Sequence, residues 1–277
     1  MTDHVQLSAI VRRALEEDVG EGDVTSLWTL PPALTGEGVF LAKAEGILAG
    51  MEVASEVFGQ VNADVRLVAA KSDGDAILPG DHLATVKGPM EAILTAERTA
   101  LNLMQRMSGI ATATHRYVEA VVGTKAVILD TRKTVPGLRI LDKWAVRLGG
   151  GQNHRMRLDD MVLIKDNHIA AAGSITAAVQ RVRKHNEKVL PVEVEVKTWA
   201  ELEEATRLEP DRIMLDNMTP EEMRRAVAWV AGRVPLEASG GINLQGVRAV
   251  AETGVDYISI GALTHSVIAL DISLEVT

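Results

Sequence analysis

The sequence predicts an α/β protein in which a small α+β unit precedes a domain built on a parallel sheet. From residue 126 onward, β-type apolar runs alternate with amphipathic helical segments, the later ones at roughly 22 to 30 residues per strand-plus-helix unit. The first third instead has short β-type runs separated by Gly-rich turns. At 277 residues, and with roughly 150 residues per domain, the chain has room for two domains or for one barrel with an appendage.

The amino-terminal part is expected to contain a helix, three strands and a long helical region. Apolar residues at helical spacing mark the first helix, which Gly20 and Gly22 end: Leu7, Ile10, Val11, Ala14 and Leu15. Short β-type runs follow at residues 38–44, 65–69 and 82–86. Residues 91–107 are predicted to form a long helix that Gly109 breaks, and a second helix then extends to about residue 122.

Six strands are expected in the second part of the chain, with the sequences AVILDT, DMVLIK, PVEVEV, RIMLDN, PLEASGG and DYISIGA. Helices are expected near residues 138–148, 174–186, 199–208, 220–232 and 244–254. The nearly continuous apolar character of the strands indicates burial on both faces, as in a parallel sheet. Six strands leave the closure of an eight-stranded barrel open. The tail LDISLEV is one more β-like run, expected to return to the first domain.

The composition excludes several classes of function. The net charge is −9, and the chain has only eight aromatic residues (four Trp, two Tyr and two Phe), which argues against a nucleic-acid partner. The absence of cysteine excludes disulfides and thiolate metal sites and fits a cytoplasmic enzyme. No apolar run approaches the ~20 residues of a membrane span, and the acidic, amphipathic start is unlike a signal peptide. Any anionic ligand must therefore be gathered by a local group of cations.

Polar and charged residues follow the expected strands at their carboxyl ends. They are Asp130 to Lys133, Lys165 to His168, Glu195 and Lys197, Asp216 and Asn217, Ser239 to Gly241, and Gly261 and Ala262. In parallel α/β domains the active site is built from the loops at that end of the sheet. So many charges cannot lie unpaired in an apolar interior, so we expect them to surround a solvated site that binds a ligand.

The last two strand-to-helix loops are candidates for phosphate binding. Ser239-Gly240-Gly241 and Gly261-Ala262 let main-chain N–H groups approach a phosphate, and the amino terminus of the following helix adds a favourable dipole. A tight turn is the alternative for either loop alone. Two such loops in succession, after the last two strands, favour phosphate.

A metal site and a cationic cluster are the other two candidates. Glu195 and Asp216 on neighbouring strand ends suit a hard cation, most simply Mg²⁺, and the alternative is an ion pair with Lys165 or Lys197. The cluster consists of Arg132, Lys133, His154, Arg155 and Lys165, with His154 and Arg155 on a Gly-rich loop. Together these features predict a phosphorylated polyanionic substrate and a second anion, hence phosphoryl or phosphoribosyl transfer or a sugar-phosphate lyase.

A resemblance to a known family adds to this interpretation. The segments LTAERTALNLMQRMSGIAT, DTRKTVPGLR, KWAVRLGGGQNHR, LIKDNHI, VEVEV, IMLDNM, EASGGI and ISIGALTHS, in this order, resemble the quinolinate phosphoribosyltransferases across nearly the whole chain. The resemblance implies an incomplete parallel α/β barrel of seven strands, residues 109–267, with an N-terminal α/β sandwich domain, residues 1–108, joined by the tail 268–277. It implies that quinolinate and phosphoribosyl pyrophosphate give nicotinate mononucleotide, pyrophosphate and CO₂ with Mg²⁺, a step of de novo NAD biosynthesis.

The resemblance also implies roles for individual residues. Thr131, Arg132, His154 and Arg155 fall in the segments expected to bind quinolinate, with Arg132, His154 and Arg155 on its two carboxylates. Lys133 and Lys165 would lie between quinolinate and the pyrophosphate, and Glu195 and Asp216 would face the ribose hydroxyls and the metal. The 5′-phosphate would be bound by Ser239, Gly240, Gly241, Ile260, Gly261 and Ala262. Arg98 would reach the neighbouring active site of a homodimer, or of a higher oligomer.

Several alternatives stay open at this point. A molybdenum-transport-associated paralogue and nicotinate phosphoribosyltransferase share the barrel, although the NHR and TRKT segments favour the carboxylating enzyme. A lyase that forms a Schiff base on Lys165 or Lys197 belongs to another class of enzyme. A catalytically silent protein that only binds quinolinate is a third possibility.

Overall fold

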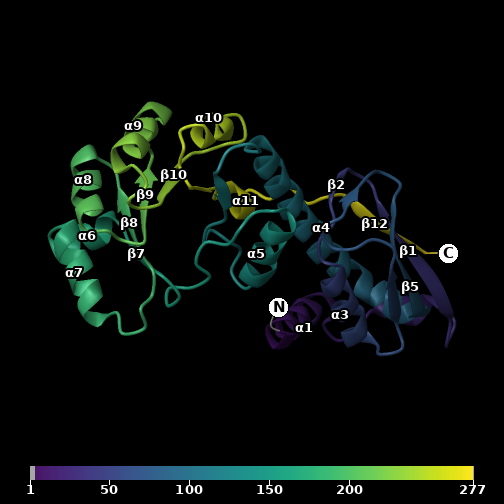
Figure 1. Ribbon diagram of the computed structural model, residues 1–277. Helices are drawn as coiled ribbons and strands as arrows, with labels where there is room; N and C mark the ends of the chain where they lie inside the picture. Colours follow the sequence, from purple (N-terminus) through teal and green to yellow (C-terminus); the bar gives the residue numbers. More distant parts are fainter. Residues whose placement is uncertain (1–3, 277) are drawn as a thin grey trace. The chain divides into compact units, whose positions relative to one another are not determined.

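The computed structural model describes residues 4–276 and divides the chain into two compact units (Figure 1). Unit 1 comprises Met1–His115, Thr134–Gly150 and Leu263–Thr277, and unit 2 comprises Arg116–Lys133 and Gly151–Ala262. Residues 1–3 and 277 of the expected first domain lie outside the described residues. The units and the expected domains differ in three places: the division falls after His115, residues 134–150 group with unit 1, and so do residues 263–267. The boundary at residue 108 stays a prediction.

Unit 1 combines a four-stranded antiparallel sheet with helices. Its elements are α1 (His4–Val19), α2 (Val24–Thr29), β1 (Thr35–Ala42), β2 (Gly46–Ile47), α3 (Met51–Val61), β3 (Arg66–Ala69), β4 (Ala76–Ile77), β5 (His82–Pro89), most of α4 (Met90–Ala120), α5 (Arg139–Leu148), most of α11 (Ala262–His265) and β12 (Ile272–Val276). The strand order is β12-β1-β5-β3, so the tail of the chain pairs with β1, Phe40 opposite Leu274. Strands β2 and β4 form a separate two-stranded ladder.

Helix α3 is an element that the sequence analysis did not anticipate. It buries Met51, Ala54, Val57 and Phe58, which fall at helical spacing within a segment rich in valine. It packs on α1 and β3. The helix begins after Gly50, whose φ of 103° places it in the left-handed region, and a side-chain oxygen of Asp73 accepts the main-chain N–H of Met51 at 2.9 Å. The cap comes from a residue distant in the sequence, so local pattern did not reveal the start of the helix.

The expected break at Gly109 is wrong, because α4 is one continuous helix from Met90 to Ala120. Gly109 serves close packing within unit 1. A Cβ atom built there would lie 2.1 Å from the carbonyl oxygen of Ile268, so only glycine lets the segment before β12 cross the helix at this point. The carbonyl of Gln105, one turn earlier, accepts the N–H of Leu270 at 2.9 Å and ties the same segment to the helix.

Unit 2 is built on a six-stranded sheet of parallel strands, as the sequence predicted. Its elements are β6 (Val127–Leu129), β7 (Val162–Ile164), α6 (Asp166–Ala172), α7 (Ile175–His185), β8 (Val192–Val196), α8 (Trp199–Arg207), β9 (Arg212–Asp216), α9 (Pro220–Val230), β10 (Leu236–Ser239), α10 (Val247–Ala251) and β11 (Tyr257–Ser259). The strand order is β6-β11-β10-β9-β8-β7, and every pairing is parallel. All five residues of β8 are buried. Figure 1 shows α7, α8 and α9 beside these strands.

Short polar caps begin the helices that follow β8 and β9. Thr198 and Glu201 form a reciprocal capping box at the start of α8, and Thr219 and Glu222 form another at α9, where Pro220 takes the first helical position. Only a few residues separate a strand end from its cap, so the side chains at the strand ends are held between two fixed elements. Within residues 4–276, no helix has the length and apolar character needed to span a membrane.

We expect Gly109→Ala to destabilise the protein although alanine normally favours a helix. The added methyl group meets the carbonyl of Ile268, and overpacking of this kind costs about 1–3 kcal/mol. Gly59→Ala in α3 is the matched control, because no atom lies within 4 Å of a Cβ atom built there, and it should stabilise by about 0.5–1 kcal/mol. Urea unfolding followed by circular dichroism measures both. Equal effects of the two substitutions would contradict the packing role of Gly109.

Candidate active site

The strand ends of unit 2 bring the expected site residues to one edge of the sheet. Because all six strands are parallel and hydrogen-bonded in register, their carboxyl ends lie on the same side. Glu195 is the penultimate residue of β8. Asp216 ends β9 and Ser239 ends β10, and these two residues are directly paired. The rest follow their strands directly: Thr131, Arg132 and Lys133 after β6, Lys165 after β7, Gly240 and Gly241 after β10, and Ile260, Gly261 and Ala262 after β11.

The Gly-rich loop that carries His154 and Arg155 runs alongside the end of β6. A parallel bridge joins Leu129 to Gln152, and the N–H of Gln152 donates to the carbonyl of Ile128 at 2.9 Å. The buried carboxylate of Asp130 then accepts the N–H of His154 at 2.9 Å and the side-chain amide of Asn153 at 2.6 Å. Asp130 thereby fixes the segment Asn153-His154-Arg155 next to the end of β6.

Two guanidinium groups gather at this end of β6. The pKa of Arg155 is lowered, first by burial and then by the positive charge of Arg132. Its Nη1 donates to the carbonyl of Met161 at 3.1 Å. Among the described residues, the Nε of Arg132 is buried and has no hydrogen-bond partner. A buried, unsatisfied donor beside a second guanidinium is costly unless an anion accepts from it, so this position suits a carboxylate or a phosphate.

Carboxylates and lysines alternate along the neighbouring strand ends. Lys165 Nζ lies 3.5 Å from Glu195 Oε2, and Lys197 Nζ lies 2.6 Å from Asp166 Oδ2 and 4.0 Å from Asp216 Oδ2. The ion pairs weighed as an alternative to a metal are therefore present. Burial raises the pKa of Glu195, Lys165 opposes this shift, and the charge of Asp216 adds to it. An additional cation between the two carboxylates would relieve their repulsion.

The Ser239-Gly240-Gly241 segment makes a tight turn against Asn217. Gly240 has a φ of 100°, and a Cβ atom there would lie 2.3 Å from Asn217 Oδ1 and 2.9 Å from its main-chain nitrogen. Asn217 is itself left-handed and donates its N–H to the carbonyl of Ser239 at 2.9 Å. The expected dipole contribution is weaker than predicted, because α10 begins only at Val247 and spans five residues, and α11 spans four. Main-chain N–H groups at the glycines are the main feature suited to phosphate.

Arg98 is the one expected site residue that belongs to unit 1. It lies on α4 and is exposed. Its expected role in a neighbouring subunit is not a property of a single chain, so it stays a prediction.

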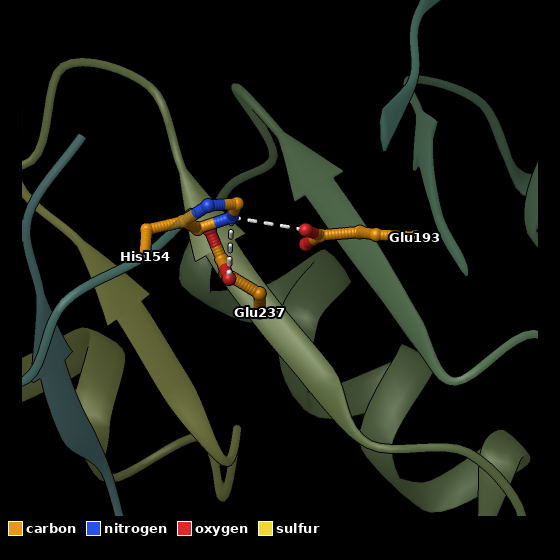
Figure 2. A group of neighbouring side chains, drawn as sticks. All are labelled: His154, Glu193 and Glu237. Atoms are coloured by element: carbon orange, nitrogen blue, oxygen red, sulfur yellow. Dashed lines mark hydrogen bonds and ion pairs between the residues drawn. The ribbon is translucent and has the colours of Figure 1, made fainter. Parts of the chain in front are cut away.

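A buried cluster that the sequence analysis missed lies below the loop. Figure 2 shows His154, Glu193 and Glu237, with Nε2 of His154 lying 2.9 Å from Glu193 Oε2 and 3.6 Å from Glu237 Oε2. Both carboxyl groups are fully buried, and Arg212 Nη1 lies 2.7 Å from Glu237 Oε2. Glu193 precedes Glu195 by two positions, so it points to the same face of β8 one layer deeper. The sequence signal that could have revealed this cluster was a charged residue, Glu193, within an apolar strand.

Burial raises the pKa of both carboxyl groups in this cluster to about 7. Arg212 opposes the shift of Glu193, while the charge of Glu193 adds to the shift of Glu237. In the part of the chain described here, Oε1 of each group lacks a hydrogen-bond partner. The pair therefore retains a proton near neutral pH.

Comparisons with known proteins agree with this geometry. The model of the quinolinate phosphoribosyl transferase C-terminal domain matches residues 110–275, and that of the N-terminal domain matches residues 23–108. The chain belongs to this family.

Individual relatives cover the chain almost completely. The probable nicotinate-nucleotide pyrophosphorylase [carboxylating] of Bacillus subtilis is 44% identical over 99% of this chain and 94% of its own length. The chloroplastic enzyme of that name from Arabidopsis thaliana is 46% identical over 98% of this chain and 82% of its own length. The nicotinate-nucleotide pyrophosphorylase structure from Francisella tularensis superposes with a TM-score of 0.96 and 40% identity, covering 100% of this chain and 98% of its own. The resemblance inferred from the sequence is thereby confirmed.

The buried glutamates should make the stability of the protein depend on pH. A carboxyl group with a pKa near 7 when folded and 4.5 as its ordinary value binds its proton more tightly in the folded state. The free energy of unfolding therefore falls as pH rises between these values, and it is flat above them. Glu237→Gln lacks this contribution. The free energy of unfolding of the variant, relative to that of wild type, should therefore increase as the pH is raised from about 5 to about 7.5.

Urea unfolding at the two pH values measures this difference. Glu187→Gln, at an exposed position of the same unit, is the matched control and should behave as wild type. A stability difference between Glu237→Gln and wild type that is the same at both pH values would rule out the retained proton.

Proposed function

We propose that this protein transfers a phosphoribosyl group to quinolinate with loss of CO₂, giving nicotinate mononucleotide and pyrophosphate for NAD biosynthesis. Membership of the family and the names of its relatives support this reaction. The observation that carries it is the pair of Arg132 and Arg155, where a buried guanidinium nitrogen lacks an acceptor among the described residues. Quinolinate carries two adjacent carboxylates, which are matched ligands for two guanidinium groups.

Each group of residues has a role that its position supports. Arg132 and Arg155 bind the two carboxylates of quinolinate, with Thr131 and His154 beside them on the same two segments. Lys133 and Lys165 lie where the ring of quinolinate meets the pyrophosphate. The main chain of the Ser239-Gly240-Gly241 turn and of the Ile260-Gly261-Ala262 segment holds the 5′-phosphate.

The reaction then follows the charges. The bond between C1 of the ribose and the pyrophosphate oxygen breaks, and Lys133 and Lys165 stabilise the charge that develops on the leaving group. Glu195 and Asp216 stabilise the positive charge at C1 from the side of the ribose hydroxyls. The pyridine nitrogen attacks C1 from the opposite face and becomes a pyridinium. Its positive charge stabilises the carbanion left when the adjacent carboxylate departs as CO₂, and a proton then replaces the carboxylate.

Glu195 and Asp216 fit the Mg²⁺ expected for this reaction. Both are hard oxygen donors on adjacent strands, and the raised pKa of Glu195, caused by its burial and increased by the charge of Asp216, marks a place where added positive charge is favourable. When bound there, Mg²⁺ would supply positive charge to the pyrophosphate oxygens.

We also infer the finer architecture and the assembly. The incomplete barrel of seven strands is supported by the parallel bridge between Leu129 and Gln152, which adds a minimal strand next to β6. A homodimer, in which Arg98 of one subunit completes the site of the other, is supported by the exposure of Arg98 on α4. The cysteine-free composition supports a cytoplasmic location.

The lyase alternative is disfavoured by the surroundings of the lysines. A lysine that forms a Schiff base needs a depressed pKa, whereas the pKa of Lys197 is raised, chiefly by its hydrogen bond to Asp166. Lys165 forms an ion pair with Glu195, with Nζ 3.5 Å from Oε2.

Incubation with quinolinate, phosphoribosyl pyrophosphate and Mg²⁺ should yield nicotinate mononucleotide and CO₂ in equal amounts. Arg132→Ala and Arg155→Ala should each lower kcat/KM for quinolinate by about a hundredfold or more, because a charged partner of a carboxylate is lost. Circular dichroism should show that the fold survives. Absence of product from the wild-type protein, or an adduct trapped by borohydride, would overturn the proposed reaction. Quinolinate binding without CO₂ release would identify a silent binding protein.

Mixing two inactive variants tests the shared site. Arg98→Ala and Arg132→Ala damage different halves of the site, so a heterodimer of the two contains one intact site. Random subunit exchange should therefore restore about a quarter of the wild-type activity. Native mass spectrometry verifies that exchange has occurred. If heterodimers form and activity stays at the level of the separate variants, Arg98 does not act across subunits.

A further inference from the structure

The two ring nitrogens of His154 are both engaged by the protein. Nδ1 accepts the main-chain N–H of Arg155 at 2.7 Å, and Nε2 faces Glu193 Oε2 at 2.9 Å. The side chain of His154 is only 6% exposed, and Figure 2 shows that the ring points at the two glutamates. A ligand approaching from solvent would therefore have to displace one of these contacts to reach a ring nitrogen.

The partners determine which nitrogen carries the hydrogen. Nδ1 accepts from an N–H group, so it cannot itself bear a hydrogen without placing two donors against each other. A neutral imidazole carries one ring hydrogen, so this hydrogen lies on Nε2, where Oε2 of Glu193 can accept it. The hydrogen-bond network thus selects the Nε2–H tautomer.

The cluster lies one layer below the carboxyl ends of the strands and is held on several sides. Glu193 comes from β8 and Glu237 from β10, and Arg212 from the intervening β9 contacts Glu237 at 2.7 Å. The guanidinium of Arg212 also lies 3.9 Å from the ring centroid of Tyr257 on β11. Four adjacent strands therefore fix the acceptors that face His154.

His154, Glu193 and Glu237 also offer the donor types of a transition-metal site. Hydrogen bonds account for Nε2 of His154 and for Oε2 of each glutamate without a metal. Arg212 already supplies positive charge to Glu237, and the distance of 2.9 Å between Nε2 and Glu193 Oε2 is that of a direct hydrogen bond.

We propose that Glu193 and Glu237 are positioning residues that lock His154 as the Nε2–H tautomer, and that His154 serves the substrate through the main chain of Arg155 and not as a ligand. This inference rests on the proposed function, in which Arg155 binds a carboxylate of quinolinate. Nδ1 of His154 accepts the main-chain N–H of Arg155 and thereby fixes the main chain that carries the Arg155 side chain. The carboxylate of Asp130 accepts the N–H of His154 itself at 2.9 Å. The direction of the Arg155 guanidinium is thereby set from the interior of the sheet.

Nitrogen NMR of the wild-type protein labelled on histidine tests the tautomer without any ligand. The His154 signals, identified by their loss in His154→Asn, should show an unprotonated Nδ1 and a protonated Nε2 at neutral pH. A protonated Nδ1 overturns the proposal. Because this measurement needs no substrate, it decides the tautomer even if the proposed reaction fails.

Two substitutions of His154 separate the indirect role from direct binding. The amide of His154→Asn places an oxygen near the position of Nδ1 and can still accept from Arg155, whereas the amide of His154→Gln replaces Nε2. We expect quinolinate affinity, measured by calorimetry, to fall about tenfold more in His154→Gln than in His154→Asn, the difference expected for one hydrogen bond. A greater loss in His154→Asn would mean that Nε2 binds the substrate directly and would overturn the indirect role.

The glutamates are tested with an apolar and a conservative substitution. Glu193→Met removes the acceptor and should raise KM for quinolinate about tenfold, while KM for phosphoribosyl pyrophosphate stays near the wild-type value. Glu193→Gln retains an acceptor and should recover most of the quinolinate affinity. An equal effect on both KM values, or no recovery in Glu193→Gln, would show general damage to the sheet and contradict a positioning role.

Discussion

The parallel hydrogen-bonded register of the six strands is the constraint on which the site depends. Neighbouring strands in one direction put their carboxyl ends along one edge, so residues separated by more than a hundred positions, such as Arg132 and Ser239, lie at the same edge of the sheet. Strand β8, buried throughout, cannot shift by one residue without turning Glu193 and Glu195 to the opposite face. The apolar strands therefore determine the position of the charges, and the charges determine the chemistry.

The charges are arranged by depth as well as by strand. At the edge, Lys165 pairs with Glu195, and Lys197 lies 4.0 Å from Asp216. One layer deeper, Glu193 and Glu237 are fully buried, and Arg212 together with a retained proton offsets their desolvation. Buried polar atoms without a hydrogen-bond partner among the described residues occur at both depths: Nε of Arg132 at the edge, and Oε1 of Glu193 and of Glu237 below it. A dianionic substrate at the edge would supply the acceptor that Arg132 lacks.

The sequence was sufficient for the parts of the fold that repeat. Six apolar runs that alternate with amphipathic helical segments, together with the polar residues at their carboxyl ends, predicted the parallel sheet and the edge where Glu195, Asp216 and Ser239 lie. It was insufficient where the cause is a tertiary contact. Gly109 has the local character of a helix breaker, but the crossing of Ile268 explains it. The cap of α3 comes from Asp73, and the partners of His154 come from strands 39 and 83 residues further along the chain, so neither follows from local spacing. The expected role of Arg98 rests on the family resemblance alone.

The turn at Gly240 limits how this site could be redesigned. A methyl group at this position would collide with the main-chain nitrogen of Asn217 as well as with its side chain, so shortening Asn217 would not make room for it. Gly241 has open space around its Cβ position and a φ of 61°, a conformation that asparagine or aspartate adopts at modest cost. A library of variants at this turn should therefore keep glycine at position 240 and place its diversity at position 241.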